Sequence, residues 1–245
     1  MDLNRAITQH LELDAFFAGF TIAGPRHSVP LAPGPTGTAR SPCLEVIAVQ
    51  IRECRRCPLG SCRTHAVPGE GHPQAGILFV GEAPGADEDA QARPFVGKAG
   101  QLLGRIIEAC GLGRTDVFIT NVLKCRPPGN RQPRPEEIVA CLPFLHAQIE
   151  CIQPQAIVAL GAHAARTLLN TNQSITQLRG PIHEYRTRPD QPPVKLLATY
   201  HPAHLLRNYT YENRRLVWED IKRLLTELGL KVPKGPAGME SPPRS

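Results

Sequence analysis

Four short apolar runs constrain the fold of this chain more than any other feature of its sequence. They are ILFV (77–80), VFIT (117–120), AIVAL (156–160) and KLLAT (195–199). Each run is short and apolar on both faces, which is typical of parallel strands that helices cover on both sides. The runs therefore predict the strands of a buried sheet.

Helical patterns separate these runs, with apolar residues at helical spacing in 102–110, after Pro135, in 162–169 and in 213–228. Strands that alternate with helices predict an α/β fold, here a three-layer α/β/α sandwich with a four-stranded, mostly parallel central sheet. Ligands of such folds bind beyond the carboxyl ends of the strands. Three of the four runs lead into conspicuous polar stretches, GEAPG, TNVLKCRPPGN and TYHPAHLLRN, so we expect the functional site there.

The ordered domain is expected to cover residues 43–230. Residues 1–42 would form an N-terminal extension, with a short amphipathic helix over 3–20. Five prolines and three glycines in 24–42 are typical of a linker. The tail, residues 231–245, has the composition of a disordered segment.

Charge and hydropathy set bounds on partners and location. A net charge of +6 and a pI of about 9.0 permit nucleic acid as a partner without requiring it. The start of the chain has no uninterrupted apolar segment typical of a signal peptide. No run approaches the roughly 18 apolar residues of a membrane helix. We therefore expect a cytoplasmic, monomeric protein with no membrane segment.

Eight cysteines in a cytoplasmic protein indicate metal or redox chemistry rather than disulfides. Cys54 and Cys57 form a C-x2-C pair, and a loop of fifteen residues separates Cys125 from Cys141. Four cysteines at one centre suit a [4Fe–4S] cluster or zinc. A zinc ribbon would prefer a second close pair, so the pattern favours the cluster, with zinc as the alternative.

Buried cysteines also occur as small apolar side chains. That interpretation suits Cys110 and Cys151, which lie beside apolar residues, but not Cys54, whose neighbours are charged. Cys62 is an alternative ligand to Cys57, and spacing alone leaves this choice open.

The stretch VGEAPGADEDAQARPFVGKAG (80–100) follows the first predicted strand. A glycine-rich turn at such a place often binds phosphate, which would make the chain a phosphate-binding α/β enzyme. The GEAPG turn lacks the lysine and threonine of a P-loop, and the acidic cluster at 87–89 would repel an anion.

The segments GEAPGADED, RPFVGKAGQLL, TNVLKCRPPGNRQPRPEEIVAC and HPAHLLRN occur in this order. Together with the cysteine spacing, they resemble the family 4 uracil-DNA glycosylases, the iron–sulfur type of bacteria and archaea, from about Cys54 to Leu228. The resemblance implies a DNA repair enzyme that flips uracil out of DNA and hydrolyses its N-glycosidic bond, which leaves an abasic site. A related branch traps uracil covalently and carries a KRRIH-type insertion that this chain lacks. A uracil-trapping or non-catalytic iron–sulfur DNA-binding protein is the alternative.

The resemblance also implies three residues that handle the base. Phe95 would stack on uracil. Asn121 would hydrogen-bond to O4 and N3–H, an edge at which cytosine has the reverse pattern. His201 would stabilise the negative charge that develops on O2. Without the resemblance, the alternatives are a core phenylalanine, an asparagine that caps a strand and a solvent-facing histidine.

The loop after the first strand is implied to shape the rest of the pocket. Backbone amides from Gly81 to Gly85 would contact O2 of uracil. Ala83 stands where the best-known uracil glycosylases have an aspartate that activates water, so that base is expected to be absent. Glu82 would position water or uracil. Glu88 would block the C5 position, where the methyl group of thymine would clash; the alternative is a solvated carboxylate at a helix start.

DNA contacts are expected from two loops. Leu205 or Leu206 would enter the gap that the flipped base leaves, with Arg207 beside them. Arg126, Lys124 and neighbouring basic residues would pair with backbone phosphates.

Overall fold

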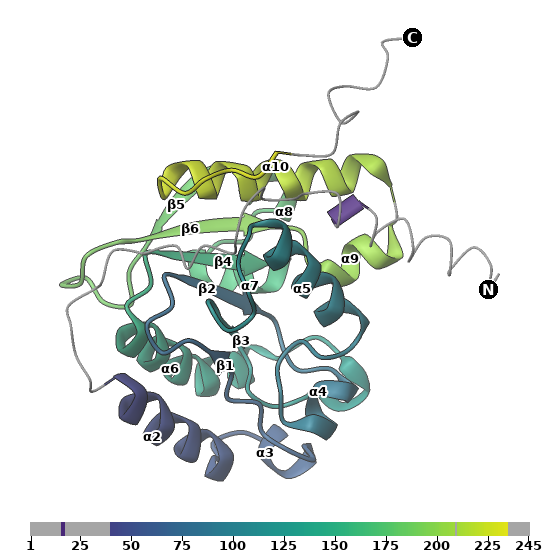
Figure 1. The fold of residues 1–245 in the computed structure, drawn as a ribbon. Coiled ribbons are helices and arrows are strands. Elements are labelled where there is room, and N and C mark those ends of the chain that lie inside the picture. The colour runs from purple at the N-terminus through teal and green to yellow at the C-terminus, as the bar shows by residue number, and fades with distance from the viewer. Residues whose placement is uncertain (1–15, 18–39, 209, 235–245) are drawn as a thin grey trace.

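The computed structural model describes residues 16–17, 40–208 and 210–234. Its centre is a six-stranded sheet with the order β1-β3-β2-β4-β6-β5 (Figure 1). The four middle strands run parallel, and they coincide with the four apolar runs: β3 (Phe118–Asn121), β2 (Ile77–Gly81), β4 (Ala156–Leu160) and β6 (Val194–Thr199). The predicted α/β sandwich with a mostly parallel sheet is therefore confirmed.

The sheet is wider than the four strands expected. β1 (Glu70–Gly71) and β5 (Ile182–Tyr185) pair antiparallel with β3 and β6 and form the two edges. Neither edge strand carries an apolar run. β1 has only two residues. β5 has the partly polar sequence IHEY, since its residues are less buried than those of a central strand. Short and partly polar edge strands give little periodic signal.

The helices predicted from periodicity are present, as α5 (Lys98–Ala109), α6 (Pro135–Ile152), α7 (Ala162–Leu169) and α10 (Tyr211–Glu227). The other helical elements lie outside the predicted patterns: α2 (Arg40–Glu53), α3 (Leu59–Cys62), α4 (Ala86–Gln91), α8 (Ile175–Leu178), α9 (Pro202–Arg207) and the 3-10 turn η1 (Pro128–Asn130). None of the helices in the described ranges is both long and apolar enough to span a membrane.

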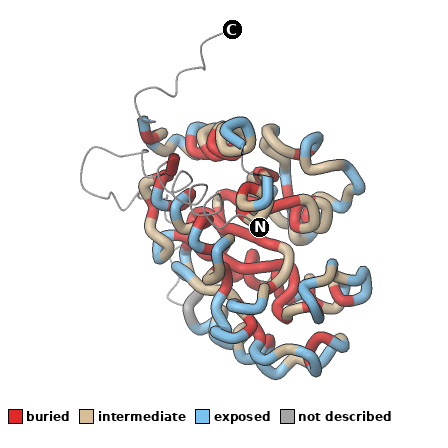
Figure 2. Tube along the Cα trace, turned by 90° about the vertical axis from the view of Figure 1, so that its right-hand side faces the viewer, coloured by how far each residue is buried: buried red, intermediate tan, exposed pale blue. Residues whose placement is uncertain are grey.

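Alternate residues of the central strands face two different cores. Ile77 and Phe79 pack in a core that contains residues of α5, α9 and α10. Leu78 and Val80 pack in a second core, with residues of α6, α7 and α8. A strand that is covered on both faces must be apolar throughout. Figure 2 shows buried residues along the middle of the molecule, between more exposed outer segments.

A third, smaller core lies beneath the N-terminal helices. Ile47 and Ile51 of α2 and Leu59 of α3 pack with Leu123 and with Phe144 of α6. This core brings the C-x2-C segment next to the chain that follows β3. It thereby positions the cysteines discussed below.

Phe16 and Phe17 of the predicted N-terminal extension are both buried in the first core. Residues 40–42, which the prediction also placed in the extension, belong to α2. The rest of the helix predicted over 3–20 lies outside the described residues. So do most of the predicted linker, 24–42, and most of the predicted tail, 231–245. These domain boundaries stay predictions.

Candidate active site and cysteine centre

A large cavity in the described part of the chain lies at the carboxyl ends of the four parallel strands. Its volume is about 440 Å³. Residues that follow β2, β3, β4 and β6 line it, as the rule for α/β folds requires. The side chains that matter for its chemistry are Glu82, Phe95, Asn121, His163, His201 and Arg207.

Asn121, the last residue of β3, faces this cavity with an unpartnered acceptor. Its side chain is buried, and within the described ranges its Oδ1 has no hydrogen-bond partner. A buried polar atom without a partner is costly unless a ligand supplies one. Gly81 faces it, since a Cβ there would lie 2.3 Å from Oδ1 of Asn121 and 2.5 Å from Cζ of Phe95. Only glycine leaves both groups in place.

Lys124 supports Asn121 from inside the protein. Its Nζ donates to the carbonyl oxygen of Asn121 at 2.7 Å, to Thr120 Oγ1 at 2.6 Å and to Gln148 Oε1 at 2.7 Å. Burial lowers the pKa of Lys124 to about 7. The expectation that Lys124 contacts DNA phosphates is therefore wrong, because its side chain is almost fully buried.

Phe95 is held in a conformation that is unusual for a large side chain. Its φ is 52°, in the left-handed region. Arg114 donates to the carbonyl oxygen of Phe95 at 3.0 Å and to that of Pro94, and it pairs with Glu70 at 2.7 Å. A Cβ at Gly100 would lie 2.0 Å from the Phe95 carbonyl, so glycine is required there. The ring is 6 % exposed and lines the cavity.

His201 stands at the N-terminus of α9, across from Phe95, with 5.7 Å between the ring centroids. Its Nδ1 accepts a hydrogen bond from the amide of Ala203 at 3.0 Å. A neutral ring that accepts at Nδ1 carries its proton on Nε2. Burial, and then the charge of Arg207, lower the pKa of His201 to about 4. The ring is therefore a neutral donor at physiological pH.

Glu82 and His163 lie together in the cavity, after β2 and β4 respectively. Burial raises the pKa of Glu82, while the charges of His163 and Arg207 oppose this shift. Our sequence interpretation missed His163. It directly follows the AIVAL strand, so the rule about strand ends would have found it.

The acidic cluster organises the loop rather than facing solvent as a group. Glu88 accepts from the amides of Gly85 at 3.0 Å, Val96 at 2.8 Å and Gly97 at 2.9 Å. It thereby ties the two walls of the cavity together. Asp89 is buried and accepts from two backbone amides of the segment after α3. Ala83 and Gly85 line the cavity, as expected.

The residues expected to contact DNA, in the segment 205–207 and at Arg126, differ in how far they are exposed to solvent. Leu205 is 1 % exposed and packs in the first core, so its proposed insertion into DNA is wrong. Apolar side chains of a short helix alternate between core and surface, and here Leu206 is partly buried and Arg207 exposed. Arg126 is partly exposed and donates to Asn130 at 2.8 Å.

The four cysteines named from the sequence gather around a second, small cavity. Cys54, Cys57, Cys125 and Cys141 all line it, whereas Cys62 is exposed and does not. Among the described residues, no three histidine, cysteine or acidic side chains are grouped as ligands of one metal ion. Four thiolates around one zinc ion lie roughly 4 Å apart, but each thiolate of a [4Fe–4S] cluster binds a different iron.

Two hydrogen-bond donors point at the sulfur atoms of this centre. Nη1 of Arg63 lies 2.9 Å from Sγ of Cys125, and the amide of Lys124 lies 3.3 Å from Sγ of Cys141. Arg63 also donates to three backbone carbonyls between 51 and 54. Such donors stabilise anionic thiolates and hold the ligand loop in place. Cys110 and Cys151 are buried in apolar surroundings, as expected for cysteines that act as small apolar side chains.

Comparison with known proteins identifies the family. The family model described as the uracil DNA glycosylase superfamily matches residues 68–223. The chain belongs to this superfamily. The matched region contains β2, β3, β4 and β6 together with every residue discussed above that lines the cavity at the strand ends.

Individual relatives within the superfamily support a closer grouping with its type-4 members. A type-4 uracil-DNA glycosylase of Thermotoga maritima is 47 % identical over 186 residues, 75 % of this chain and 94 % of the relative. One of Sulfurisphaera tokodaii is 46 % identical over 74 % of this chain and 83 % of the relative. A type-5 uracil-DNA glycosylase of Pyrobaculum aerophilum is 29 % identical over 78 % of this chain and 89 % of the relative.

Proposed function

We propose that this protein removes uracil from DNA by hydrolysing the N-glycosidic bond, which leaves an abasic site for repair. The observation that carries the proposal is the unpartnered side-chain oxygen of Asn121, which faces a cavity that Phe95 and His201 also line. A buried acceptor beside an aromatic ring suits a planar, uncharged base that carries its own donor. The family and its type-4 members support this assignment.

Base selection follows from the amide and from the walls of the cavity. Oδ1 of Asn121 would accept from N3–H of uracil, and its NH2 group would donate to O4. Cytosine has an acceptor at N3 and a donor at C4, so both contacts would become repulsive. Thymine has the same edge as uracil and must be excluded at its methyl group. We assign the exclusion of thymine to the cavity wall that Glu88 holds. Three hydrogen bonds from backbone amides to the Glu88 carboxylate keep this wall rigid.

The chemistry would rest on the leaving group. As the glycosidic bond breaks, uracil leaves as an anion whose charge lies partly on O2. Nε2–H of a neutral His201 would donate to that oxygen, and a donor so placed is worth about 100-fold or more in rate. Neutral His201 suits this role because it needs no proton from solvent at physiological pH.

Water activation would be weak in this enzyme. Ala83 lines the cavity and offers no carboxylate. Glu82 also lines the cavity, beside His163, and is the group that would position the water. We therefore infer a dissociative reaction in which water adds to a sugar that already carries positive charge.

We further propose that Cys54, Cys57, Cys125 and Cys141 hold a [4Fe–4S] cluster. The fit of the donor set supports this, since four thiols line one cavity and N–H donors point at two of the sulfurs. The cluster would have a structural role, holding α2 and α3 against the chain after β3. Zinc is the alternative occupant.

DNA would lie across the mouth of the cavity. Leu206 would fill the gap left by the flipped base, and Arg207 and Arg126 would pair with phosphates. We propose that the protein is a monomer that acts on single- or double-stranded DNA. We propose the cytoplasm as the site of this reaction.

Two substitutions in the cavity test the function. We expect Asn121→Ala and His201→Ala each to reduce kcat/KM for a uracil oligonucleotide at least about 100-fold. The melting temperature and visible absorbance should stay close to those of the wild type. His72→Ala, at an exposed histidine, is the control and should keep full activity. Full activity of either cavity variant would show that the base binds elsewhere. A stable uracil-DNA adduct instead of turnover would favour the uracil-trapping alternative.

A further inference from the structure

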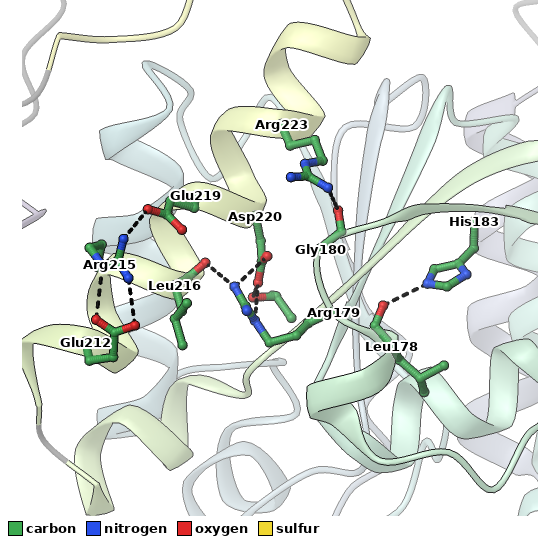
Figure 3. Close-up of polar contacts among 11 residues, drawn as sticks. Leu178, Arg179, Gly180, His183, Glu212, Arg215, Leu216, Glu219, Asp220 and Arg223 are labelled. Carbon is green, nitrogen blue, oxygen red and sulfur yellow. Dashed lines mark hydrogen bonds and ion pairs between the residues drawn. The ribbon is translucent and has the colours of Figure 1, made fainter.

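A buried ion pair joins α10 to the segment that follows α8 (Figure 3). Arg179 donates to both carboxylate oxygens of Asp220, from Nε to Oδ2 at 3.1 Å and from Nη2 to Oδ1 at 2.8 Å. Nη2 also donates to the carbonyl oxygen of Leu216 at 2.8 Å. The Asp220 side chain is 2 % exposed and that of Arg179 is 14 % exposed. Water and salt therefore screen this pair little.

The same carboxylate holds the last residue of β6. The hydroxyl of Thr199 donates to Oδ2 of Asp220 at 2.7 Å. The backbone of Arg179 forms a parallel bridge with Ala198, the preceding residue of the strand. From the opposite side, the amide of Gly161 donates to the carbonyl oxygen of Thr199 at 2.8 Å. The end of β6 is therefore fixed by three separate segments of the chain.

The chain reaches His201 two residues after this fixed point. Between them, the ring of Tyr200 has its centroid 5.5 Å from the guanidinium carbon of Arg179 and 4.8 Å from the ring of His204, on which it stacks. A Cβ at Gly161 would lie 2.9 Å from Cβ of His201, so the backbone there packs closely against the histidine. A shift of the strand end would be transmitted directly to the imidazole.

We propose that Arg179 and Asp220 are positioning residues for His201 and act through Thr199; we call these three the β6 clamp. The inference rests on the proposed function, because it assigns the clamp to the donor that stabilises departing uracil. Such donors depend steeply on geometry, and a displacement of about 1 Å can cost about 100-fold in rate. A buried ion pair is often no more stabilising than apolar residues of equal volume. Its value here is therefore a fixed geometry.

The opposite side of α10 carries an ion pair that serves as the control for the pair of Arg179 and Asp220. Arg215 pairs with Glu212 at 2.7 Å and with Glu219 at 2.8 Å, and its side chain is 43 % exposed. Figure 3 shows these groups away from the Asp220 carboxylate. Arg215 does not line the catalytic cavity, and exposed pairs of this kind contribute little. Arg215→Ala thus removes an ion pair from the same helix, and Arg215 forms no hydrogen bond with the three residues of the clamp.

Two substitutions at Thr199 test the proposal without burying an unpaired charge. Thr199→Val keeps the shape of the side chain and removes the hydroxyl, whereas Thr199→Ser keeps the hydroxyl. With a saturating single-stranded uracil oligonucleotide, we expect kcat to fall about 10-fold in Thr199→Val. KM should change less than about twofold, and Thr199→Ser should stay within about twofold of the wild type, because the positioning bond is restored.

Asp220→Asn and the double variant Asp220→Asn/Thr199→Val complete a double-mutant cycle with Thr199→Val. If one hydrogen bond carries the effect, the double variant should lose no more kcat than the more affected single variant, while Arg215→Ala stays within about twofold of the wild type. Equal kcat for Thr199→Val, Thr199→Ser and the wild type would overturn the proposal, even if melting temperatures differ. Should Asp220→Asn fail to fold, the Thr199 pair still decides. No excision by the wild type would instead contradict the proposed function itself.

Discussion

Gly81 is a residue whose missing side chain decides what the cavity can hold. A Cβ there would collide with both Asn121 and Phe95, so Gly81→Ala must push one wall of the pocket aside. We expect uracil excision to fall at least about 100-fold. Gly104→Ala is the matched control, since a Cβ at that helical position meets nothing within 4 Å. Measurement of kcat/KM for both variants checks this. An active Gly81→Ala enzyme would mean that these walls do not hold the base.

The residues of the pocket were predictable from sequence, but the use of their polar atoms was not. Phe95, Asn121 and His201 line the cavity as expected, because the motifs that contain them follow strands of one sheet. The sequence could not show that the carboxylate of Glu88 accepts hydrogen bonds from three backbone amides. Nor could it show which of two adjacent leucines faces the core, and Leu205 does.

At the scale of elements, the loop between α4 and α5 depends on an arginine distant in sequence. Arg114 holds the carbonyl oxygens of Pro94 and Phe95, and its charge is balanced by Glu70. We expect Arg114→Ala to reduce kcat/KM about 10-fold, because stacking on an aromatic ring is worth about 1–3 kcal/mol per base and the ring would lose its fixed position. Arg93→Ala is the control.

Arg93 pairs with the same Glu70 carboxylate at 2.8 Å and is 57 % exposed. Its guanidinium hydrogen-bonds to Glu70 and not to Phe95, so Arg93→Ala should leave excision within about twofold of the wild type. Equal losses in the two variants would assign the effect to Glu70 rather than to the support of Phe95. Steady-state kinetics with one uracil oligonucleotide separate these results.

The elements that could be predicted were those with a strong apolar period. The four central strands and α5, α7 and α10 agree with the sequence pattern within a few residues. The helix predicted after Pro135 runs on through Pro143, a residue type that usually ends a helix, to Ile152. The edge strands and the short helices were missed, since tertiary contacts rather than local periodicity define them.

At the scale of the whole molecule, the cysteine centre links the N-terminal helices to the sheet. We expect Cys141→Ser to lose the broad absorbance near roughly 400 nm that a cysteine-ligated cluster gives, together with part of the thermal stability. Cys62→Ser is the control, because Cys62, at the end of α3, is exposed and does not line the cavity of the four cysteines. Full absorbance of Cys141→Ser would remove this residue from the ligand set. Zinc in place of iron in the purified wild type would identify the alternative occupant.

The four strand ends, two loops and α9 converge on one cavity, and the central claim is that this cavity binds and excises uracil. The most direct measurement uses two end-labelled single-stranded oligonucleotides that differ in one base, uracil or thymine, with alkali to cleave abasic sites. The account predicts cleavage at uracil and none at thymine. Cleavage at both would contradict the steric block at C5, and no cleavage at uracil by cluster-loaded protein would contradict the glycosylase function.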